Sequence, residues 1–480
     1  MTEQTIAVVG AGFSGTLLAL HLMRQCSPNV RVVLAERNEQ FGRGAAYATG
    51  NSSHLLNVPA SRMSAFQSRP DDFLNWLRSL PDNERHGVEP SPTTFVPRSI
   101  FGRYIQDLLT SEIKSAVHCG HLDLVRADVT DIDPRSGGLT LTLSDGTVLP
   151  VDRAVLAIGN FPPSPPPVAD PSFYDTPAYR PDPWAPDLLD GLRNDAPVLL
   201  IGTGLTMIDT VVSLLDRGHR GRIIALSRRG LLPHNHFKGP STTGLPENEQ
   251  LPTRVNALAR FLRTRSLKAN DAGGCWQAVI DELRPLTTDI WRAMSPADRT
   301  RFLRHLRPWW DTHRHRVSDP VAERITQARE RGQLSILAGR IRHYAMGADG
   351  LVEVGYLPRF KDKLDKVQAA RIINCAGPES DFGRIRDPLV RRLLDKGLVR
   401  PDPLSLGLDV TQNCALLNRD GAISRRLFAV GPVTKGTFWE MTAVPDIRQQ
   451  AEFLAGQLAA LVRPQAQPAT PPPSDVAWSI

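Results

Sequence analysis

Two glycine-rich turns carry the residue types that bind dinucleotides. In "VVGAGFSG", Gly10, Gly12 and Gly15 follow the β-branched apolar run 6–9 and precede an apolar helical stretch. The first glycine of such a turn permits a sharp bend, the second lets the backbone approach a pyrophosphate, and the third lets the helix pack closely on the strand. Free N–H groups and the positive helix end then bind the phosphates. A second turn, "IGTGLTMID", repeats Gly202 and Gly204, so the chain is expected to bring two dinucleotides together.

The first turn leads to an acidic residue at the end of the next strand pattern. Glu36 stands 26 residues after Gly10 and ends "VRVVLAE". A carboxylate at this place accepts a hydrogen bond from a ribose hydroxyl and repels a 2′-phosphate, which predicts FAD or NAD. The Gly-rich, extended stretch after Glu36 favours FAD. The alternative is a tight strand-to-helix connection without a ligand.

The second turn leads to a different ending. Its third glycine is missing, and its next strand pattern, "RIIALSRR", ends in Ser227, Arg228 and Arg229. A hydroxyl and two guanidiniums suit a 2′-phosphate, which predicts NADPH. The alternative is that the paired arginines are solvated surface charges.

Several stretches resemble known flavoproteins. "ERNEQFGRGAAYATGNSSHLLNVPASRMSAF" and "FVPRSIFGRYIQDLL" are similar to a bacterial FAD/NAD(P)-binding flavoprotein family. "VDRAVLAIGNFPPSPPPV" and "ARIINCAGPESDF" resemble the paired linkers of two-dinucleotide-domain flavoproteins such as the class B and N-hydroxylating monooxygenases. "RRLFAVGPVTKGTFWEM" resembles the element that brings backbone N–H groups to the flavin, although Pro432 replaces the usual aspartate.

The resemblance implies an α/β fold of two Rossmann-like dinucleotide-binding domains, with the NADPH domain inserted in the FAD domain. We expect the following division: FAD domain, first part, 1–165; linker 166–196; NAD(P)H domain 197–376, with a helical insert at 251–332; FAD domain, second part, 377–463; disordered Pro-rich tail 464–480.

The insert and the linker indicate which subgroup of two-dinucleotide-domain flavoproteins the chain resembles. No dinucleotide signature falls within 251–332, so we expect this insert to cover the shared cleft and select the substrate. Trp309 and Trp310 are expected to pack in a core or a cleft wall. Class B monooxygenases carry a fingerprint with a glycine and a histidine before the second turn, and "PSFYDTPAYRPDPW" has only Phe173 and Trp184 of it. This favours, by analogy, the N-hydroxylating branch.

The residues expected to contact the cofactors are Gly10, Gly12, Ser14, Gly15, Glu36, Arg37, Gly159, Gly202, Gly204, Leu205, Thr206, Ser227, Arg228, Arg229, Gly377 and Gly431. Five polar residues in segments expected to reach the flavin ring are the candidates for catalysis: Asn57, Arg62, Ser64, Lys435 and Thr437. For Asn57 and Ser64 the alternative is a local turn role, because Asn and Ser favour such roles.

The predicted activity is a flavin-dependent oxidoreduction. We expect NADPH to reduce FAD, and O2 activation with N-oxygenation of a small amine or amino acid to follow. An NAD(P)H:acceptor reductase without oxygen insertion is the alternative. A non-catalytic flavin-binding or RNA-associated protein is a further one, suggested by the net charge of +7.

Composition excludes several other classes. With 41% hydrophobic and 22% charged residues, the chain is typical of a soluble globular protein. The five cysteines are scattered without a CxxC pair, which argues against zinc, disulfides and thiol redox chemistry. His313 and His315 stand without a third ligand nearby, so no metal is expected. We expect a cytoplasmic enzyme whose partners are a small-molecule substrate and O2, with no membrane and no nucleic acid.

Overall fold

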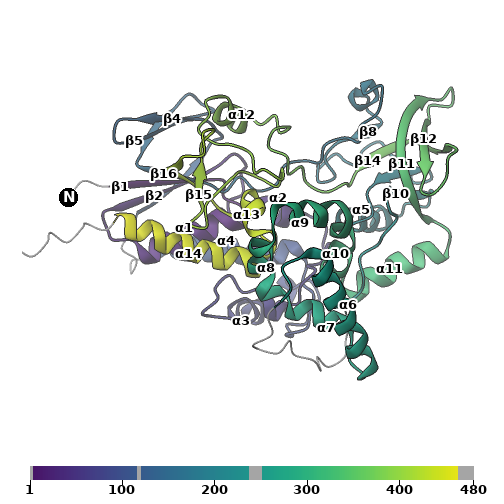
Figure 1. Ribbon diagram of the computed structural model, residues 1–480, viewed down its shortest axis with the longest axis horizontal. Coiled ribbons are helices and arrows are strands. Elements are labelled where there is room, and N and C mark those ends of the chain that lie inside the picture. Colours follow the sequence, from purple (N-terminus) through teal and green to yellow (C-terminus); the bar gives the residue numbers. More distant parts are fainter. Residues whose placement is uncertain (1–3, 116–120, 237–250, 463–480) are drawn as a thin grey trace, which may run out of the picture.

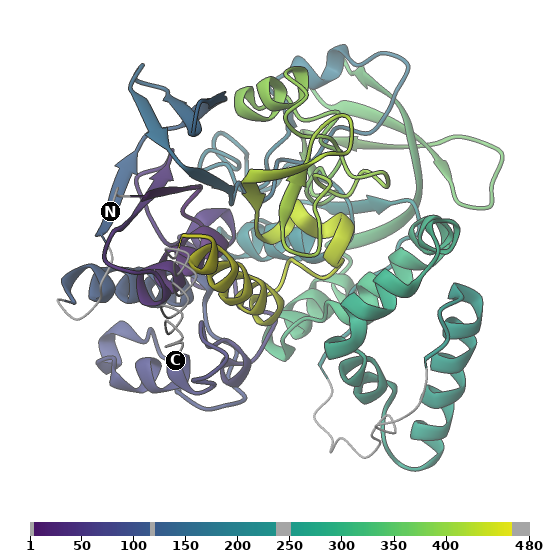
Figure 2. The same ribbon diagram turned by 60° about the vertical axis from the view of Figure 1, so that its left-hand side comes forward.

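The computed structural model describes residues 4–115, 121–236 and 251–462 (Figures 1 and 2). The tail predicted at 464–480 lies outside the described residues. Two largely parallel sheets dominate the described chain and are set at opposite ends of Figure 1, with a group of helices below and between them.

The first sheet has the order β15-β16-β7-β1-β2-β3, and all its neighbours are parallel except β15 and β16. Its central strand β1 lies between β2 and β7, and the apolar run from Ile6 to Val9 is buried there, as is typical of a parallel strand covered on both faces. The strands are β1 (Gln4–Val9), β2 (Val30–Glu36), β3 (His121–Arg126), β7 (Arg153–Leu156), β15 (Ala415–Leu417) and β16 (Ile423–Ala429).

Helices from both ends of the chain cover this sheet. The yellow α14 lies alongside the purple α1 in both views (Figures 1 and 2). A three-stranded antiparallel sheet, β4-β5-β6, contacts β1, β7 and α12. The elements of this half are α1 (Phe13–Gln25), α2 (Gly44–Tyr47), α3 (Asp72–Ser79), α4 (Arg98–Lys114), β4 (Val129–Arg135), β5 (Gly138–Leu143), β6 (Val148–Val151), α12 (Pro388–Asp395), α13 (Lys435–Phe438) and α14 (Val444–Val462).

The second sheet has the order β13-β12-β11-β10-β9-β14-β8. Strands β11, β10, β9, β14 and β8 run parallel, and β12 and β13 extend the sheet as antiparallel neighbours. The strands are β8 (Tyr179–Arg180), β9 (Val198–Ile201), β10 (Ile223–Ser227), β11 (Leu334–Met346), β12 (Val352–Pro358), β13 (Asp365–Ala369) and β14 (Arg371–Asn374), and the helix after β9 is α5 (Leu205–Asp216).

The order of the strands shows how the second sheet is inserted into the first. The chain leaves the first sheet after β7, builds the second sheet, and returns at β16, which pairs in parallel with β7. The α/β fold with two dinucleotide-binding units is therefore confirmed. Strand β8, which pairs with β14 at the edge of the second sheet, falls within the range predicted to be a linker.

Six helices lie between β10 and β11 in the part of the chain that the structure describes, and they form the teal group in Figure 1. A π-helical turn, η5 (Phe302–Leu306), joins α9 to α10, and Pro308 follows directly in α10. The helices are α6 (Val255–Asp271), α7 (Trp276–Glu282), α8 (Thr287–Ala293), α9 (Pro296–Arg301), α10 (Arg307–Arg314) and α11 (Asp319–Glu330). None of the helices in the described ranges is both long and apolar enough to cross a bilayer.

Candidate active site

The first glycine turn connects β1 to α1 through close backbone contacts. Gly10 has a φ of 99°, and a Cβ there would lie 2.5 Å from the Ala157 carbonyl oxygen. A Cβ on Gly15 would overlap the Gly10 carbonyl oxygen. At Gly12, the nearest heavy atom to an added Cβ is the Gly44 Cα at 3.5 Å. The turn therefore packs tightly at Gly10 and Gly15, and Gly12, at the N-terminus of α1, is the least crowded of the three, as the glycine expected to face a pyrophosphate should be.

Glu36 lies at the C-terminal end of β2, beside this turn. Its side chain is buried, and its carboxylate accepts hydrogen bonds from the Ala11 N–H at 2.8 Å and from the Asn38 N–H at 2.9 Å. The carboxylate is thus held at the turn, where a ribose hydroxyl can reach it. Arg37 turns elsewhere: its guanidinium pairs with Asp387 at 3.1 Å and with Asp128 at 3.4 Å.

The segment between β16 and α14, called the return segment below, lies directly on the first turn. Gly431 has a φ of 79°, and a Cβ there would overlap the hydroxyl of the buried Ser14. The Gly431 N–H donates to the Gln450 side-chain oxygen at 2.7 Å, and the Gln450 amide nitrogen donates to Thr434 at 2.9 Å. Gly159 has a φ of 67° and open space where a Cβ would stand. Ser14 and Gly431 therefore meet, although Gln450 takes the N–H of Gly431.

The second glycine turn opens into a cleft of about 960 Å³. Gly202 has a φ of 112°, and a Cβ there would overlap the Cys375 carbonyl oxygen. A Cβ on Gly204 would meet no heavy atom within 4 Å. Eight residues predicted to contact a cofactor line this one cleft: Gly202, Gly204, Leu205, Thr206, Ser227, Arg228, Arg229 and Gly377.

Four arginines gather at one side of this cleft. Arg228 and Arg229 follow β10, while Arg340 and Arg342 stand on β11, and all four line the cleft. No ion pair joins any of the four to a described acidic residue. Burial lowers the pKa of Arg228, and the charges of Arg340, Arg307 and Arg229 lower it further. This is an uncompensated positive site, which is suited to a phosphate.

The sequence could have indicated the β11 pair. "GRIRHY" alternates arginine with other residues at the period of a strand, and β11 is the parallel neighbour of β10, with Ser227 opposite Ala338. The arginines become recognisable as one cluster only once that pairing is known.

The five candidates for catalysis occupy different environments. Ser64 is fully buried, and its hydroxyl bonds to two carbonyl oxygens of its own loop, which fits the local turn role. Thr437 donates to a backbone carbonyl at 2.9 Å, and the Asn57 carbonyl accepts from a histidine ring nitrogen at 3.0 Å. Arg62 is exposed. Roles for these four residues at the flavin stay predictions.

Lys435 is the candidate with an unusual charge environment. Burial lowers its pKa to about 8; the Arg307 guanidinium adds to this effect, and Asp311 and Glu440 oppose it. Its ammonium lies 4.9 Å from the centre of the Trp439 ring. A lysine whose pKa is near 8 can hold or release a proton near neutral pH.

Comparison with known proteins accords with this geometry. Residues 7–161 match the family described as FAD-NAD(P)-binding. The matched range contains the first glycine turn, Glu36 and Gly159.

Similarities to other proteins extend beyond residues 7–161. An uncharacterized protein of Mycobacterium tuberculosis is 24% identical over 95% of this chain and 95% of its own length. The L-aspartate N-monooxygenase (nitrosuccinate-forming) of Streptomyces cremeus is 28% identical over 49% of this chain and 40% of its own length. The ornithine hydroxylase (PvdA) of Pseudomonas aeruginosa has the same fold, with a TM-score of 0.65 at 16% identity over 96% of this chain and 100% of that chain.

Sequence reasoning missed a buried polar pair where the helical insert meets the segment between β16 and α14. The Trp310 ring N–H donates to the Glu440 carboxylate at 2.8 Å, and the Arg314 Nε lies 3.5 Å from the other carboxylate oxygen. Burial raises the pKa of Glu440, but His315 and Arg314 outweigh burial and lower it. Two nitrogens of Arg314, Nε and Nη2, have no hydrogen-bond partner among the described residues. No sequence motif links these residues.

The open space at Gly204 leads to a first prediction. Gly204→Ala will raise the KM for NADPH and for NADH alike, by about tenfold or more, because a methyl group there occupies the space of the pyrophosphate that both coenzymes carry. The Gly204 φ of −87° suits alanine, so thermal stability will stay unchanged. Steady-state kinetics and a melting curve check this. An unchanged KM for both coenzymes would place the pyrophosphate elsewhere.

The pKa of Lys435 predicts a pH effect on stability. In the folded chain this pKa is about 8, below the value of about 10.4 in an unfolded chain. Between these pH values the unfolded state binds more protons, so the free energy of unfolding rises with pH. We expect the stability of flavin-free wild type, relative to Lys435→Met, to increase from pH 7.5 to 9.5.

Urea unfolding at the two pH values measures this difference, with Lys363→Met as the control at an exposed position. If wild type and Lys435→Met gained or lost stability in parallel, the environment of Lys435 would not be the one described.

Proposed function

We propose that this protein is an FAD-dependent, NADPH-using monooxygenase that oxygenates the nitrogen of an amine or amino acid. The observation that carries the proposal is the contrast between the two turns. The first is paired with the buried carboxylate of Glu36, and the second with an arginine cluster that no described acid neutralises. A carboxylate suits the ribose of FAD, and the guanidiniums suit the 2′-phosphate of NADPH.

The residues present fit both groups. The space at Gly12 and the N-terminus of α1 accommodate the pyrophosphate of FAD, and the space at Gly204 and the N-terminus of α5 accommodate that of NADPH. Bound FAD would supply the redox chemistry, since a flavin can take up hydride from NADPH and transfer reducing equivalents to O2. The overall reaction is R–NH2 + O2 + NADPH + H⁺ → R–NHOH + H2O + NADP⁺.

The protein's own contribution is binding, orientation and proton handling. Lys435, with its pKa near 8, is suited to hold or deliver a proton where the helical insert meets the return segment. The buried Glu440 and Arg314 supply fixed charges there. N-oxygenation is favoured because proteins with this fold include an ornithine hydroxylase and a cadaverine monooxygenase of Erwinia amylovora, and a relative in sequence is named an L-aspartate N-monooxygenase.

An NAD(P)H:acceptor reductase is the second candidate. The thioredoxin reductase of T. acidophilum shares the fold, with a TM-score of 0.51 at 12% identity. However, the sequence has no CxxC pair, and Cys275, Cys375 and Cys414 are buried and free. Burial raises the pKa of Cys375 and of Cys414 to about 12, which keeps both thiols protonated and poorly reactive. A thiol–disulfide relay of this chain's own is therefore disfavoured.

The proposal is tested with the purified yellow protein. NADPH and NADH oxidation are followed together with hydrogen peroxide release while amines and amino acids are added one at a time. NADPH oxidation with peroxide suppressed by one amine, and a matching amount of hydroxylamine product, would support the proposal. NADPH oxidation that requires another electron acceptor would indicate the reductase. Flavin that stays oxidised under anaerobic NADPH would point to the non-catalytic or RNA-associated alternative.

A further inference from the structure

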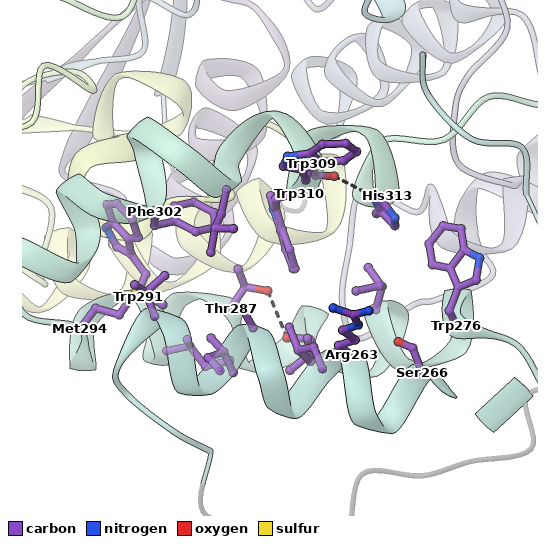
Figure 3. A pocket seen from close by; sticks show the side chains of 18 of the residues that line it. Arg263, Ser266, Trp276, Thr287, Trp291, Met294, Phe302, Trp309, Trp310 and His313 are labelled. Atoms are coloured by element: carbon purple, nitrogen blue, oxygen red, sulfur yellow. Dashed lines mark hydrogen bonds between the residues drawn. The ribbon is translucent and has the colours of Figure 1, made fainter. Parts of the chain in front are cut away.

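The helical insert forms an apolar cavity of about 480 Å³ that is partly open to solvent (Figure 3). Helices α6, α7, α8 and α10 form its walls, together with residues of η5 and one side chain of the return segment. Five of the eight tryptophans of the chain line it: Trp276, Trp291, Trp309, Trp310 and Trp439. Ligand cavities in proteins have volumes of roughly 300–1,000 Å³ and walls that are mostly apolar and aromatic.

A strained residue connects this cavity to the segment between β16 and α14. Trp439 has a φ of 59°, a backbone conformation that a bulky side chain rarely adopts. Its ring stacks on Trp291 at 4.7 Å between centroids, and the Trp291 ring N–H donates to the Gly436 carbonyl oxygen at 2.8 Å. Such strain persists where the surroundings impose it, and it gathers at binding sites. Here it places an aromatic ring in the cavity wall, four residues after Lys435.

The stretch from η5 through α10 is a wall shared by this cavity and the NADPH cleft. Leu306, Trp309 and His313 line the apolar cavity. Arg307 and Asp311, which alternate with them along the helix, line the cleft that holds the second glycine turn. A molecule in the cavity would therefore lie across one helix from the bound nicotinamide coenzyme.

The charged groups of the cavity are of one sign. None of the described residues that line it is acidic. Arg263 is the arginine of the lining; Figure 3 shows its guanidinium rising from α6 toward the cavity, and no ion pair joins it to a described acid. His313 lies across from Arg263, with its ring nitrogen bonded to the Trp309 carbonyl oxygen at 2.8 Å. An anionic group at this end has a partner, whereas a cationic group has none.

We propose that this cavity binds the hydrocarbon body of the substrate, an aromatic or branched apolar group, and that Arg263 pairs with an anionic group carried at its outer end. The proposal rests on the proposed function, because it assigns the site to the substrate. It narrows the substrate class from amines in general to apolar amines that carry a carboxylate away from the nitrogen. A small polar amino acid would leave most of this aromatic wall without contact.

The test uses the holoenzyme with 4-(aminomethyl)benzoate and with benzylamine, which lacks the carboxylate. Binding is measured by tryptophan fluorescence and by calorimetry. We expect the carboxylate compound to bind about fivefold more tightly than benzylamine in the wild type, as an exposed ion pair allows. Arg263→Gln will remove this difference. The control Arg260→Gln, on an exposed face of the same helix outside the lining, will retain it.

Two variants that fill the cavity keep the test independent of folding defects. Ala259→Phe and Ser266→Phe each place a ring in the space, and we expect each to weaken the binding of both compounds at least tenfold while the flavin spectrum stays unchanged. Undiminished binding to both filled variants would overturn the proposal, as would equal affinity for the two compounds in the wild type.

Turnover is read separately from binding. In the wild type, 4-(aminomethyl)benzoate will lower the ratio of peroxide released to NADPH oxidised, and the filled variants will not show this effect. Binding without any change in that ratio would overturn the assignment to the substrate. If NADPH were not oxidised at all, the proposed function would fail, and the fluorescence result would still report on the cavity by itself.

Discussion

Replacing Arg228 and Arg340 together by glutamine will raise the KM for NADPH by about 100-fold and leave the KM for NADH nearly unchanged. The two guanidiniums line the second cleft, one after β10 and the other on β11, and after burial the charge of Arg340 is the main cause that lowers the pKa of Arg228. A hydrogen bond to a charged group contributes roughly 1.5–3 kcal/mol, so an effect of about 100-fold corresponds to the loss of two bonds at the lower end of this range. NADH lacks the 2′-phosphate and thus serves as the matched ligand.

Steady-state kinetics with both coenzymes measures this change. Arg193→Gln, which removes an exposed arginine outside the cleft, is the control variant. An equal rise of KM for NADPH and NADH would place the two arginines at the pyrophosphate. If the KM rose for neither coenzyme, Arg228 would be a solvated surface charge and would not bind the 2′-phosphate. The Gly204→Ala variant complements this test, because it is expected to affect both coenzymes alike.

The strands and helices around the two glycine turns could be predicted because their signal is local. The strand, the glycines and the helix of the first turn are contiguous in sequence, and Glu36 follows at the end of the very next strand. The order of the two turns and the return of the chain at β16 also follow from contiguous patterns. In each case short-range sterics and hydrophobic period determine the structure.

The set of side chains that come together at the candidate active site could not be predicted, because these residues meet only through tertiary structure. Arg340 reaches Arg228 through the pairing of β10 with β11, across more than a hundred residues of sequence. Glu440 meets Arg314 where the insert packs on the return segment. Ser64 shows the converse: the sequence indicated a polar residue near the flavin, and the structure engages its hydroxyl in its own loop.

The insert illustrates the same limit. Its helices and its position before β11 were predictable. Which residues of η5 and α10 line which cavity was not predictable. There, neighbouring residues face two different cavities, since Leu306 lines the apolar one and Arg307 the charged one. The helical period separates the two faces, and only the packed structure shows what each face covers.

Gly15→Ala will give a protein that retains little or no flavin. A Cβ on Gly15 would overlap the Gly10 carbonyl oxygen and lie 3.0 Å from the Ala157 side chain, so α1 must move away from β1 and β7. Overpacking of this kind costs roughly 1–3 kcal/mol, and the shift also displaces the helix N-terminus that binds the pyrophosphate. We expect less flavin after purification, together with a lower melting temperature in the flavin-free state.

Alanine variants of two further glycines distinguish flavin loss caused by overpacking from flavin loss caused by a blocked pyrophosphate site. Gly12→Ala adds a methyl group whose nearest neighbour is 3.5 Å away, so the flavin-free protein will melt like the wild type, while flavin binding is lost because the methyl group takes the space of the pyrophosphate. Gly456→Ala, on α14, places its Cβ 3.4 Å from the Gln25 side chain and will keep both flavin and stability. The flavin absorbance per protein and the melting temperature of each variant decide the matter. A Gly15→Ala protein with full flavin and an unchanged melting temperature would show that α1 does not approach the sheet as closely as the turn requires.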